Sequence, residues 1–391
     1  MSTPARFSFS FSKFPEAGLI LVIIVLGLLL SIFGGSVSLP KFENLPDGTR
    51  KRAMVADADG QQKPAFETVN KFFNAKTLVQ LAKDTSFFAI MAVGMTVVII
   101  TGGIDLSIGA IYALAAVSGA LMLSSAGPNA GFAPILLGVV VTVATGTLLG
   151  FLNGSMISGF NVHPFIITLG TMAIYRGIAF VLTGGQSIGG FPEGFRQFVR
   201  WELLPELSFV PLIFMIIITI VGGIFLSRLA IGRKIYAVGG NETASRYSGI
   251  RVGRVKVLAY AISGFVAGIA AMLSLGYYGA GTSGDGQGYE LNVIAAAVVG
   301  GASLIGGKGT ALGALLGAII LQMITNGLVI LSIPQNYSQI VIGLVVIAAV
   351  LFDRLNAWLS NRRLLAKTSR IKKEVVQESD TPISIPPQPS K

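Results

Sequence analysis

The residues of this chain that could do chemistry are few, and they lie in apolar surroundings. Asp105 closely follows Gly102-Gly103 within a long apolar stretch, and Arg176 lies in the middle of another. An ionisable group at membrane depth is costly and usually serves a functional site or a structural pair. Asp105 can cap the helix that follows it, or it can also face a polar path for a hydroxyl-rich substrate. Arg176 can pair with Asp105 or with a helix C-terminus.

Covalent, metal and nucleotide chemistry are not predicted. His163 is the only histidine and cysteine is absent, so neither a histidine-based triad nor a zinc cluster can be assembled. Gly307-Lys308 suggests a phosphate-binding loop, but Ala302 replaces its first glycine and Gly309 replaces its Ser/Thr. We therefore expect no enzyme activity, no metal and no cofactor. His163, just before Pro164, reads as a spacer at a membrane interface.

Composition identifies the elements that must position these residues. The chain has 391 residues, 52% of them hydrophobic and 12% charged, whereas soluble domains average about 25% charged residues. The continuous apolar runs, each near the roughly 20 residues that a spanning helix needs, favour helices over a barrel. We expect an all-α polytopic membrane protein with about eight to ten transmembrane helices. The candidate spans are 17–36, 86–104, 106–126, 132–152, 164–184, 208–228, 257–276, 291–305, 311–332 and 337–353.

Loop charges predict the orientation. The loop 229–256 and the start of the tail are rich in Lys and Arg, whereas the loops 185–207 and 277–290 carry an excess of acids. The positive-inside rule then places both termini and the loop 229–256 in the cytoplasm. The expected divisions are a cytosolic N-terminus 1–16, a first span 17–36, an external loop 37–85 with a loosely folded insertion 41–70, a core 86–353, and a disordered cytosolic tail 354–391.

Glycine patterns predict an internal repeat and close helix packing. The motif GG-x4-[I/L]-G-A-[I/L] occurs at Gly102 and again at Gly306, 204 residues later. Transporters are often built from repeats with interrupted helices at matching positions. Glycines four residues apart, as in 146/150/154, 264/268 and 309/313/317, favour tight helix packing within the subunit, with subunit dimerisation as the alternative.

The basic loop 229–256 contains a short capped helix. Asn241 is a good N-cap, Glu242 suits the positive end of the helix dipole, and Gly249 suits the position after the helix. The predicted helix spans Glu242–Ser248. Two turns are not stable alone in water, so this helix needs packing against its own membrane domain or against a partner.

Four motifs resemble one known family. TGGIDLSIG at 101–109, PFIITLGTMAIYRG at 164–177, GRKIYAVGGNETASRYSGI at 232–250 and ELNVIAAAVVGGASLIGGKGT at 290–310 are similar, in order, to ribose-type permeases of bacterial ABC sugar importers. The resemblance covers residues from about 72 to about 354. Two features depart from it: Ala244-Ser245 stands where the family more often has Ala-Ala, and the insertion 41–70 is longer than expected.

The resemblance implies a permease that pairs as a homodimer, a cytosolic ATPase that supplies energy, and an external binding protein that delivers the sugar. It places five residues in a cleft of the ATPase: Asn241, Glu242, Ala244, Ser245 and Gly249. We expect Gly240, directly before them, to take part in the same coupling contact. We expect the translocation path to include Asp105, Ser107, Arg176, Glu290 and Asn292.

The predicted function is transport of a monosaccharide by alternating access, with no nucleic-acid partner. The alternatives are an ion-coupled secondary transporter with Asp105 as its coupling carboxylate, an ABC permease for a nucleoside or a furanose signalling molecule, and a receptor or scaffold that anchors a soluble partner.

Overall fold

The computed structural model describes residues 16–44, 50–56, 61–204, 207–345, 347–348 and 350–351. The predicted N-terminal segment up to residue 15 and the predicted disordered tail 354–391 lie outside these residues. Within the described residues, seven helices are long and apolar enough to cross a membrane. The prediction of an all-α polytopic membrane protein is therefore confirmed for the core.

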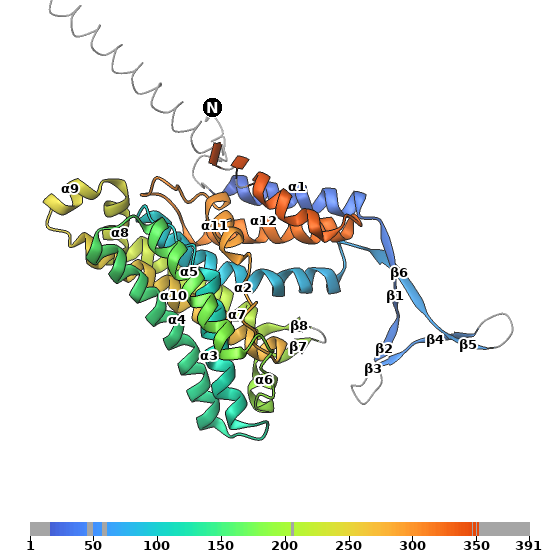
Figure 1. Ribbon diagram of the computed structural model, residues 1–391. Coiled ribbons are helices and arrows are strands. Elements are labelled where there is room, and N and C mark those ends of the chain that lie inside the picture. The colour runs from blue at the N-terminus through green and yellow to red at the C-terminus, as the bar shows by residue number, and fades with distance from the viewer. Residues whose placement is uncertain are drawn as a thin grey trace, which may run out of the picture. The chain divides into compact units, whose positions relative to one another are not determined.

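Three helices form the buried centre of the core (Figure 1): α2 (Ala75–Ile100), α3 (Ile108–Ala126) and α10 (Val252–Tyr278). Each is apolar around most of its circumference, and the second half of α2, from Ala89 to Ile100, is buried without a break. Helix α10 packs against α2, α3 and α4 (Phe132–Phe160). A helix that is apolar all round belongs in the interior of a large or membrane protein.

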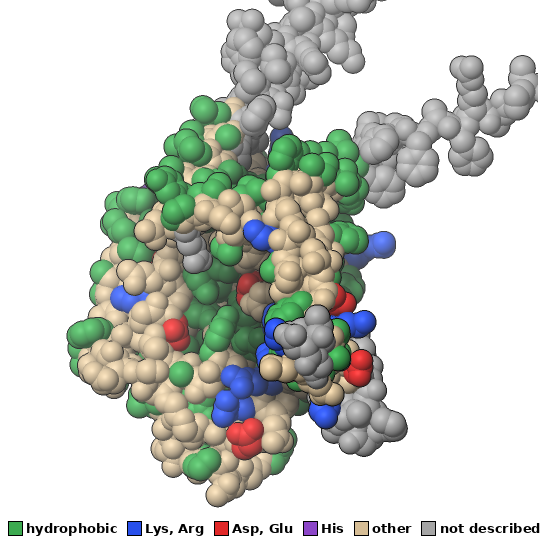
Figure 2. All heavy atoms as spheres, turned by 90° about the vertical axis from the view of Figure 1, so that its right-hand side faces the viewer, with side chains coloured by type: hydrophobic (Ala, Val, Ile, Leu, Met, Phe, Trp, Pro, Cys, Tyr) green, Lys and Arg blue, Asp and Glu red, His purple; other side chains and the backbone are tan. Residues whose placement is uncertain are grey.

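The outer helices expose apolar side chains. They are α4, α5 (Pro164–Thr183) and α7 (Phe209–Arg228), with α12 (Ala311–Ile330) and α1 (Ala17–Phe33) packed against each other. Figure 2 shows one face, on which hydrophobic side chains alternate with polar and charged groups around a hollow near the middle. On the outer helices the exposed large apolar side chains include Leu148, Ile174 and Ile220. Apolar surface of this extent suits contact with lipid.

Glycines bring α4 and α10 into close contact. A Cβ added to Gly264 would lie 3.0 Å from the Cα of Gly150, and one added to Gly146 would lie 2.9 Å from the Cα of Gly268. A Cβ added to Gly317 of α12 would lie 2.8 Å from the N of Gly300 at the end of α11 (Tyr289–Val299). The glycine stripes therefore pack helices within the subunit, as predicted.

Several predicted boundaries were wrong. Helix α2 begins at Ala75, not at residue 86, because the Asn74 side chain caps it by accepting a hydrogen bond from the N–H of Thr77 at 2.9 Å. The span predicted at 291–305 ends at Val299, where Gly300 and Gly301 begin a series of turns that leads to α12. Gly301 has φ +94°, a conformation open to glycine and strained for other residues. Residues 338–345 are helical.

The insertion contains paired strands that the sequence analysis missed (Figure 1). Three antiparallel two-stranded ladders form: β1 (Ser36–Pro40) with β6 (Phe66–Asn70), β2 (Phe42–Asn44) with β3 (Arg50–Arg52), and β4 (Met54–Ala56) with β5 (Gln62–Pro64). They meet where Lys41, Ala53 and Ala65 form a closed ring of backbone hydrogen bonds of 2.7–2.9 Å. The prediction that this insertion is loosely folded is wrong for its described residues. Pairing between the strands gives their backbone N–H and C=O groups hydrogen-bond partners.

The segment before α7 holds one short helix and one pair of short strands. Helix α6 (Glu193–Val199) packs on α10, and β7 (Glu202–Leu204) pairs with β8 (Leu207–Ser208). Between α7 and α10 lie two short helices, α8 (Ala230–Gly240) and α9 (Glu242–Tyr247).

Candidate functional site

Arg176, in the middle of α5, donates hydrogen bonds to two carbonyl oxygens of the loop before α11 and to one carboxylate oxygen of α11. Its Nη1 donates to the carbonyl oxygens of Ser283 at 2.8 Å and Asp285 at 2.5 Å, and its Nη2 lies 3.3 Å from Oε1 of Glu290. Both predicted partners of Arg176, Asp105 and a helix C-terminus, are therefore wrong. Two of the predicted path residues, Arg176 and Glu290, do lie together.

The loop 282–288 is shaped to meet Arg176. The Asp285 carboxylate accepts hydrogen bonds from the N–H of Thr282 at 2.9 Å and from its hydroxyl at 2.7 Å, which closes a turn. Gly286 and Gly288 adopt φ +67° and +82°. At Gly109 of α3, a Cβ would collide with the Glu290 carboxylate and with the carbonyl of Gly286, so this position has no room for a side chain. Glycine therefore lets α3 approach the ion pair closely.

A cavity of about 560 Å³ adjoins the pair. It is lined by Met172, Ala173, Arg176, Phe180, Ser283, Gly284, Gln287 and Glu290. The arginine and glutamate side chains are 25% and 12% exposed, so the ion pair is partly buried but remains accessible from the cavity. Guanidinium donors, carboxylate acceptors and an amide can exchange hydrogen bonds with the hydroxyls of a solute.

Asp105 lies elsewhere, in a buried network among α3, α4 and α5. Its Oδ1 accepts from the N–H of Ser107 at 3.0 Å and from the Ser107 hydroxyl at 2.6 Å. The Asn153 amide donates to the Ser107 hydroxyl at 2.7 Å, and the Tyr175 hydroxyl donates to the Asn153 carbonyl at 3.0 Å. Asp105, Ser107 and Asn153 are fully buried.

These contacts form a local turn before α3, because the carboxylate binds the N–H of Ser107, the residue that immediately precedes the helix. The helix-capping interpretation of Asp105 stays a prediction. Sequence analysis missed Asn153 and Tyr175. Their signal is an amide and a phenol in the interior of apolar spans, groups that require a partner when buried. The network joins three helices beside the first helix interruption.

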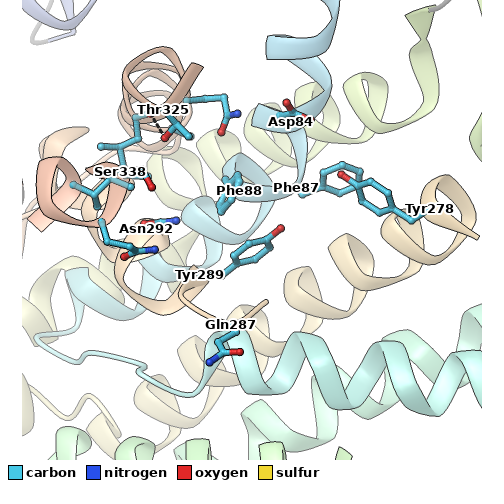
Figure 3. A pocket seen from close by; sticks show the side chains of 15 residues that line it. Asp84, Phe87, Phe88, Tyr278, Gln287, Tyr289, Asn292, Thr325 and Ser338 are labelled. Atoms are coloured by element: carbon cyan, nitrogen blue, oxygen red, sulfur yellow. Dashed lines mark hydrogen bonds between the residues drawn. The ribbon is translucent and has the colours of Figure 1, made fainter. Parts of the chain in front are cut away.

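Asn292, the remaining predicted path residue, lines a second cavity (Figure 3). This cavity measures about 290 Å³ and lies among α2, α10, α11, α12 and the helical residues from 338 onward. Gln287 lines both cavities, so they adjoin.

The short helix in the loop 229–256 is confirmed as α9. The Asn241 side chain accepts from the N–H of Ala244 at 2.8 Å, and Gly249 follows the helix with φ +80°. Ala244 is exposed, whereas Ser245 is only 5% exposed and faces its own subunit. Of the six predicted contact residues, Ser245 is therefore covered by this chain itself.

Glu242 fastens α9 to the start of α10. Its carboxylate lies 2.7 Å from Nζ of Lys256 and 3.2 Å from Nη2 of Arg246. The hydrogen bond from Lys256 is the main cause that holds the pKa of Glu242 below its ordinary value; partial burial opposes it, and Arg246 lowers the pKa further. Glu242 is therefore charged at neutral pH.

Four glycines join this loop to both helix interruptions. We call Gly102, Gly239, Gly306 and Gly307 the glycine junction. The N–H of Gly307 donates to the carbonyl of Ile100, the last residue of α2, at 2.8 Å. A Cβ on Gly306 would lie 2.7 Å from the Gly239 carbonyl and 3.1 Å from the N of Gly102. The end of α8, directly before α9, thus contacts the second GG motif and Ile100, which lies two residues before the first.

A bundle of apolar helices with interrupted spans and a polar cavity is typical of membrane transport proteins. The family model described as the permease component of branched-chain amino acid transport systems matches residues 77–350. The chain therefore belongs to this permease family, and it is a multi-pass membrane protein that acts as a transport subunit, not as an enzyme.

Curated relatives agree. The ribose import permease protein RbsC of Haemophilus influenzae is 40% identical over 72% of this chain and 86% of its own length. The D-allose transport system permease protein AlsC of Escherichia coli K12 is 38% identical over 73% of this chain and 85% of its own. The autoinducer 2 import system permease protein LsrC of Photorhabdus laumondii is 32% identical over 73% and 83%. These matches confirm the resemblance to ribose-type permeases. No solved structure matches significantly.

Proposed function

We propose that this chain forms the transmembrane path of a sugar importer driven by ATP hydrolysis on a separate chain. The observation that carries the proposal is the similarity, at 38–40% identity over nearly three quarters of the chain, to permeases named for ribose and allose. The cavity beside Arg176 and Glu290 supports it, because it offers donors and acceptors suited to hydroxyl groups.

The proposed assembly places both termini and α9 in the cytoplasm, as the loop charges favour. Two copies of the chain pair around the path, an ABC ATPase binds from inside, and a secreted binding protein delivers the sugar from outside. Exposed Ala244 and Tyr247, which is 88% exposed, support a partner contact on α9.

The proposed mechanism is alternating access. When the ATPase subunits close, they move α9, and the rigid end of α8 transmits this movement to both helix interruptions through the glycine junction. The contacts of Gly239 with Ile100 and Gly307 support this step, because tightly packed backbone cannot yield locally and must move together.

Within the path, Arg176, Glu290 and Asn292 would contact the solute from their cavities. Asp105 and Ser107 would instead hold α3 in place from the buried network. Three of the five predicted path residues thus line cavities, and the other two lie in the buried network.

The test is uptake by proteoliposomes that contain the permease and its ATPase. ATP on the ATPase side and binding protein on the other should drive uptake of D-ribose or D-allose. L-leucine is the comparison solute, because the family description names branched-chain amino acids. Uptake of leucine without uptake of either sugar would refute the sugar assignment. Gly240→Asp, at an exposed position, should weaken ATPase association and leave membrane insertion intact.

A further inference from the structure

The second cavity has the lining of a sugar site. Polar groups come from five elements: Asp84 on α2, Gln287 in the loop before α11, Asn292 on α11, Gln322 on α12, and Gln339 in the helical residues from 338 onward. Figure 3 shows Asn292, Thr325 and Ser338 gathered on one side of the cavity. Convergence of polar side chains from separate elements on one cavity is typical of a small-molecule site.

Asn292 and Asp84 bring hydrogen-bonding groups to this lining. Asn292 lines the cavity and is partly exposed, while its Oδ1 is itself buried and accepts no hydrogen bond within the described protein. The Asp84 carboxylate, on the same cavity, accepts from the Gln80 amide at 2.7 Å through Oδ1 and has further acceptor capacity. The carboxylate of Asp84 therefore suits a hydroxyl donor, and the amide of Asn292 lies beside it in the lining.

Aromatic rings provide the apolar part of the lining. Phe88 and Tyr289 have ring centroids 4.4 Å apart, and Phe87 and Tyr278 have centroids 5.9 Å apart. Figure 3 shows Tyr289 close to Phe88, and Tyr278 close to Phe87. The flat C–H faces of a sugar ring pack well against aromatic rings, while its hydroxyls reach the amides.

Charge narrows the ligand class. The lining contains Asp84 and no Lys, Arg or His, so an anionic ligand such as a sugar phosphate or a free carboxylate would be repelled. The volume of about 290 Å³ lies just below the range of about 300–1,000 Å³ for small-molecule sites. The cavity therefore suits one small, neutral, polyhydroxylated molecule.

The position of the cavity suits a site where the sugar enters the transmembrane path. Asp84 precedes the end of α2 at Ile100 by sixteen residues, or about 24 Å along the helix. The cavity thus lies far from the glycine junction, in the half of α2 that follows the insertion. Through Gln287 it adjoins the cavity of Arg176 and Glu290.

We propose that the cavity lined by Asp84, Phe88, Tyr289, Asn292 and Gln322 is a low-affinity binding site for a neutral monosaccharide. This site adjoins the Arg176–Glu290 cavity. This inference rests on the proposed function and adds a site to it. Sugar hydroxyls there form hydrogen bonds with the Asp84 carboxylate and the amide side chains of the lining, and the ring lies against the aromatic side chains.

The test uses the full permease–ATPase complex in lipid nanodiscs without binding protein, so that any binding belongs to the membrane subunits. The probes are tritiated D-ribose and D-allose, with ribose 5-phosphate as competitor. Saturable binding of one sugar, not displaced by the phosphate, is expected. No saturable binding to the wild-type complex would overturn the inference.

Variants locate the site. Asn292→Ala and Gln322→Ala should each weaken binding about tenfold, and Thr325→Phe, which fills the cavity, should abolish it. The matched control is Thr147→Val on α4, which also removes a part-buried hydroxyl, one bonded to the Val143 carbonyl away from this cavity. If all three cavity variants bind sugar as the wild type does, the site lies elsewhere.

Uptake separates this inference from the proposed function. If wild-type proteoliposomes take up sugar and the cavity variants show an unchanged KM, only the site is refuted. If the wild type takes up no sugar at all, both are refuted. A raised KM in the cavity variants with an unchanged KM in Thr147→Val supports both.

Discussion

Replacing Gly239 by alanine tests whether the glycine junction transmits movement. The added Cβ would lie 2.6 Å from the N of Gly307 and closer still to the carbonyl of Ile100. Ordinary contact distances are about 3.5–4.0 Å, so the end of α8 must move away by at least about 1 Å. Overpacking of this kind typically costs about 1–3 kcal/mol.

This free-energy cost applies only to conformations in which the end of α8 packs against Ile100 and Gly307. A difference of about 1–3 kcal/mol between two conformations changes their ratio by about 5- to 150-fold. We therefore expect sugar uptake per ATP hydrolysed to fall at least about fivefold in Gly239→Ala. The assay measures uptake and ATP hydrolysis in the same proteoliposomes, with the ATPase and the binding protein present.

A helical glycine with open space around it is the matched control. A Cβ on Gly223 of α7 would meet nothing within 4 Å, and its φ is not in the left-handed region. Gly223→Ala should therefore leave uptake per ATP unchanged, and it should not lower stability, since alanine favours helix by about 1 kcal/mol over glycine. Equal coupling ratios in wild type, Gly239→Ala and Gly223→Ala would refute the role of the junction.

Four further predictions follow from individual contacts. Arg176→Ala, which removes three hydrogen bonds, should raise the KM for sugar uptake at least about tenfold; an unchanged KM would remove Arg176 from the path. Asn241→Ala should lose about 1 kcal/mol of capping energy and speed hydrogen exchange in α9, while Asn241→Asp retains the cap; equal exchange in both would contradict capping. Because the folded-state pKa of Glu242 is lowered, its ion pair with Lys256 stabilises α9 above about pH 4.5, and this stabilisation is lost as pH falls through the lowered pKa. Amide protection in α9 should show that loss, and Glu242→Gln should abolish the pH dependence. Gly264→Leu should prevent the close approach of α4 and α10 and abolish folded protein in membranes, whereas assembly at wild-type levels would show that this contact is dispensable.

Local signals in the sequence were sufficient for the helices and for the capped loop. The core spans are long and apolar, and Asn241, Glu242 and Gly249 occupy the positions that cap a helix, so α9 could be predicted from residue type alone. The glycine stripes of α4 and α10 also indicated their packing, because only glycine on one face allows backbones so close.

Pairings over long sequence distances could not be predicted. Arg176 and Glu290 are 114 residues apart, and the sequence does not specify which acid meets an intramembrane arginine. The glycine junction brings together segments around residues 102, 239 and 306, each of which is locally only a turn. The strands of the insertion were missed because its ladders are short and polar, so periodicity gives a weak signal.

The most direct test of the account is the energy source for uptake. Proteoliposomes with the permease and its ATPase should accumulate D-ribose or D-allose only when ATP is on the ATPase side and the binding protein is on the other. Uptake should stop when ATP is replaced by a non-hydrolysable analogue. Its rate should not change when an uncoupler dissipates the proton gradient. Uptake that follows a proton gradient without ATP would contradict the account and would favour an ion-coupled transporter.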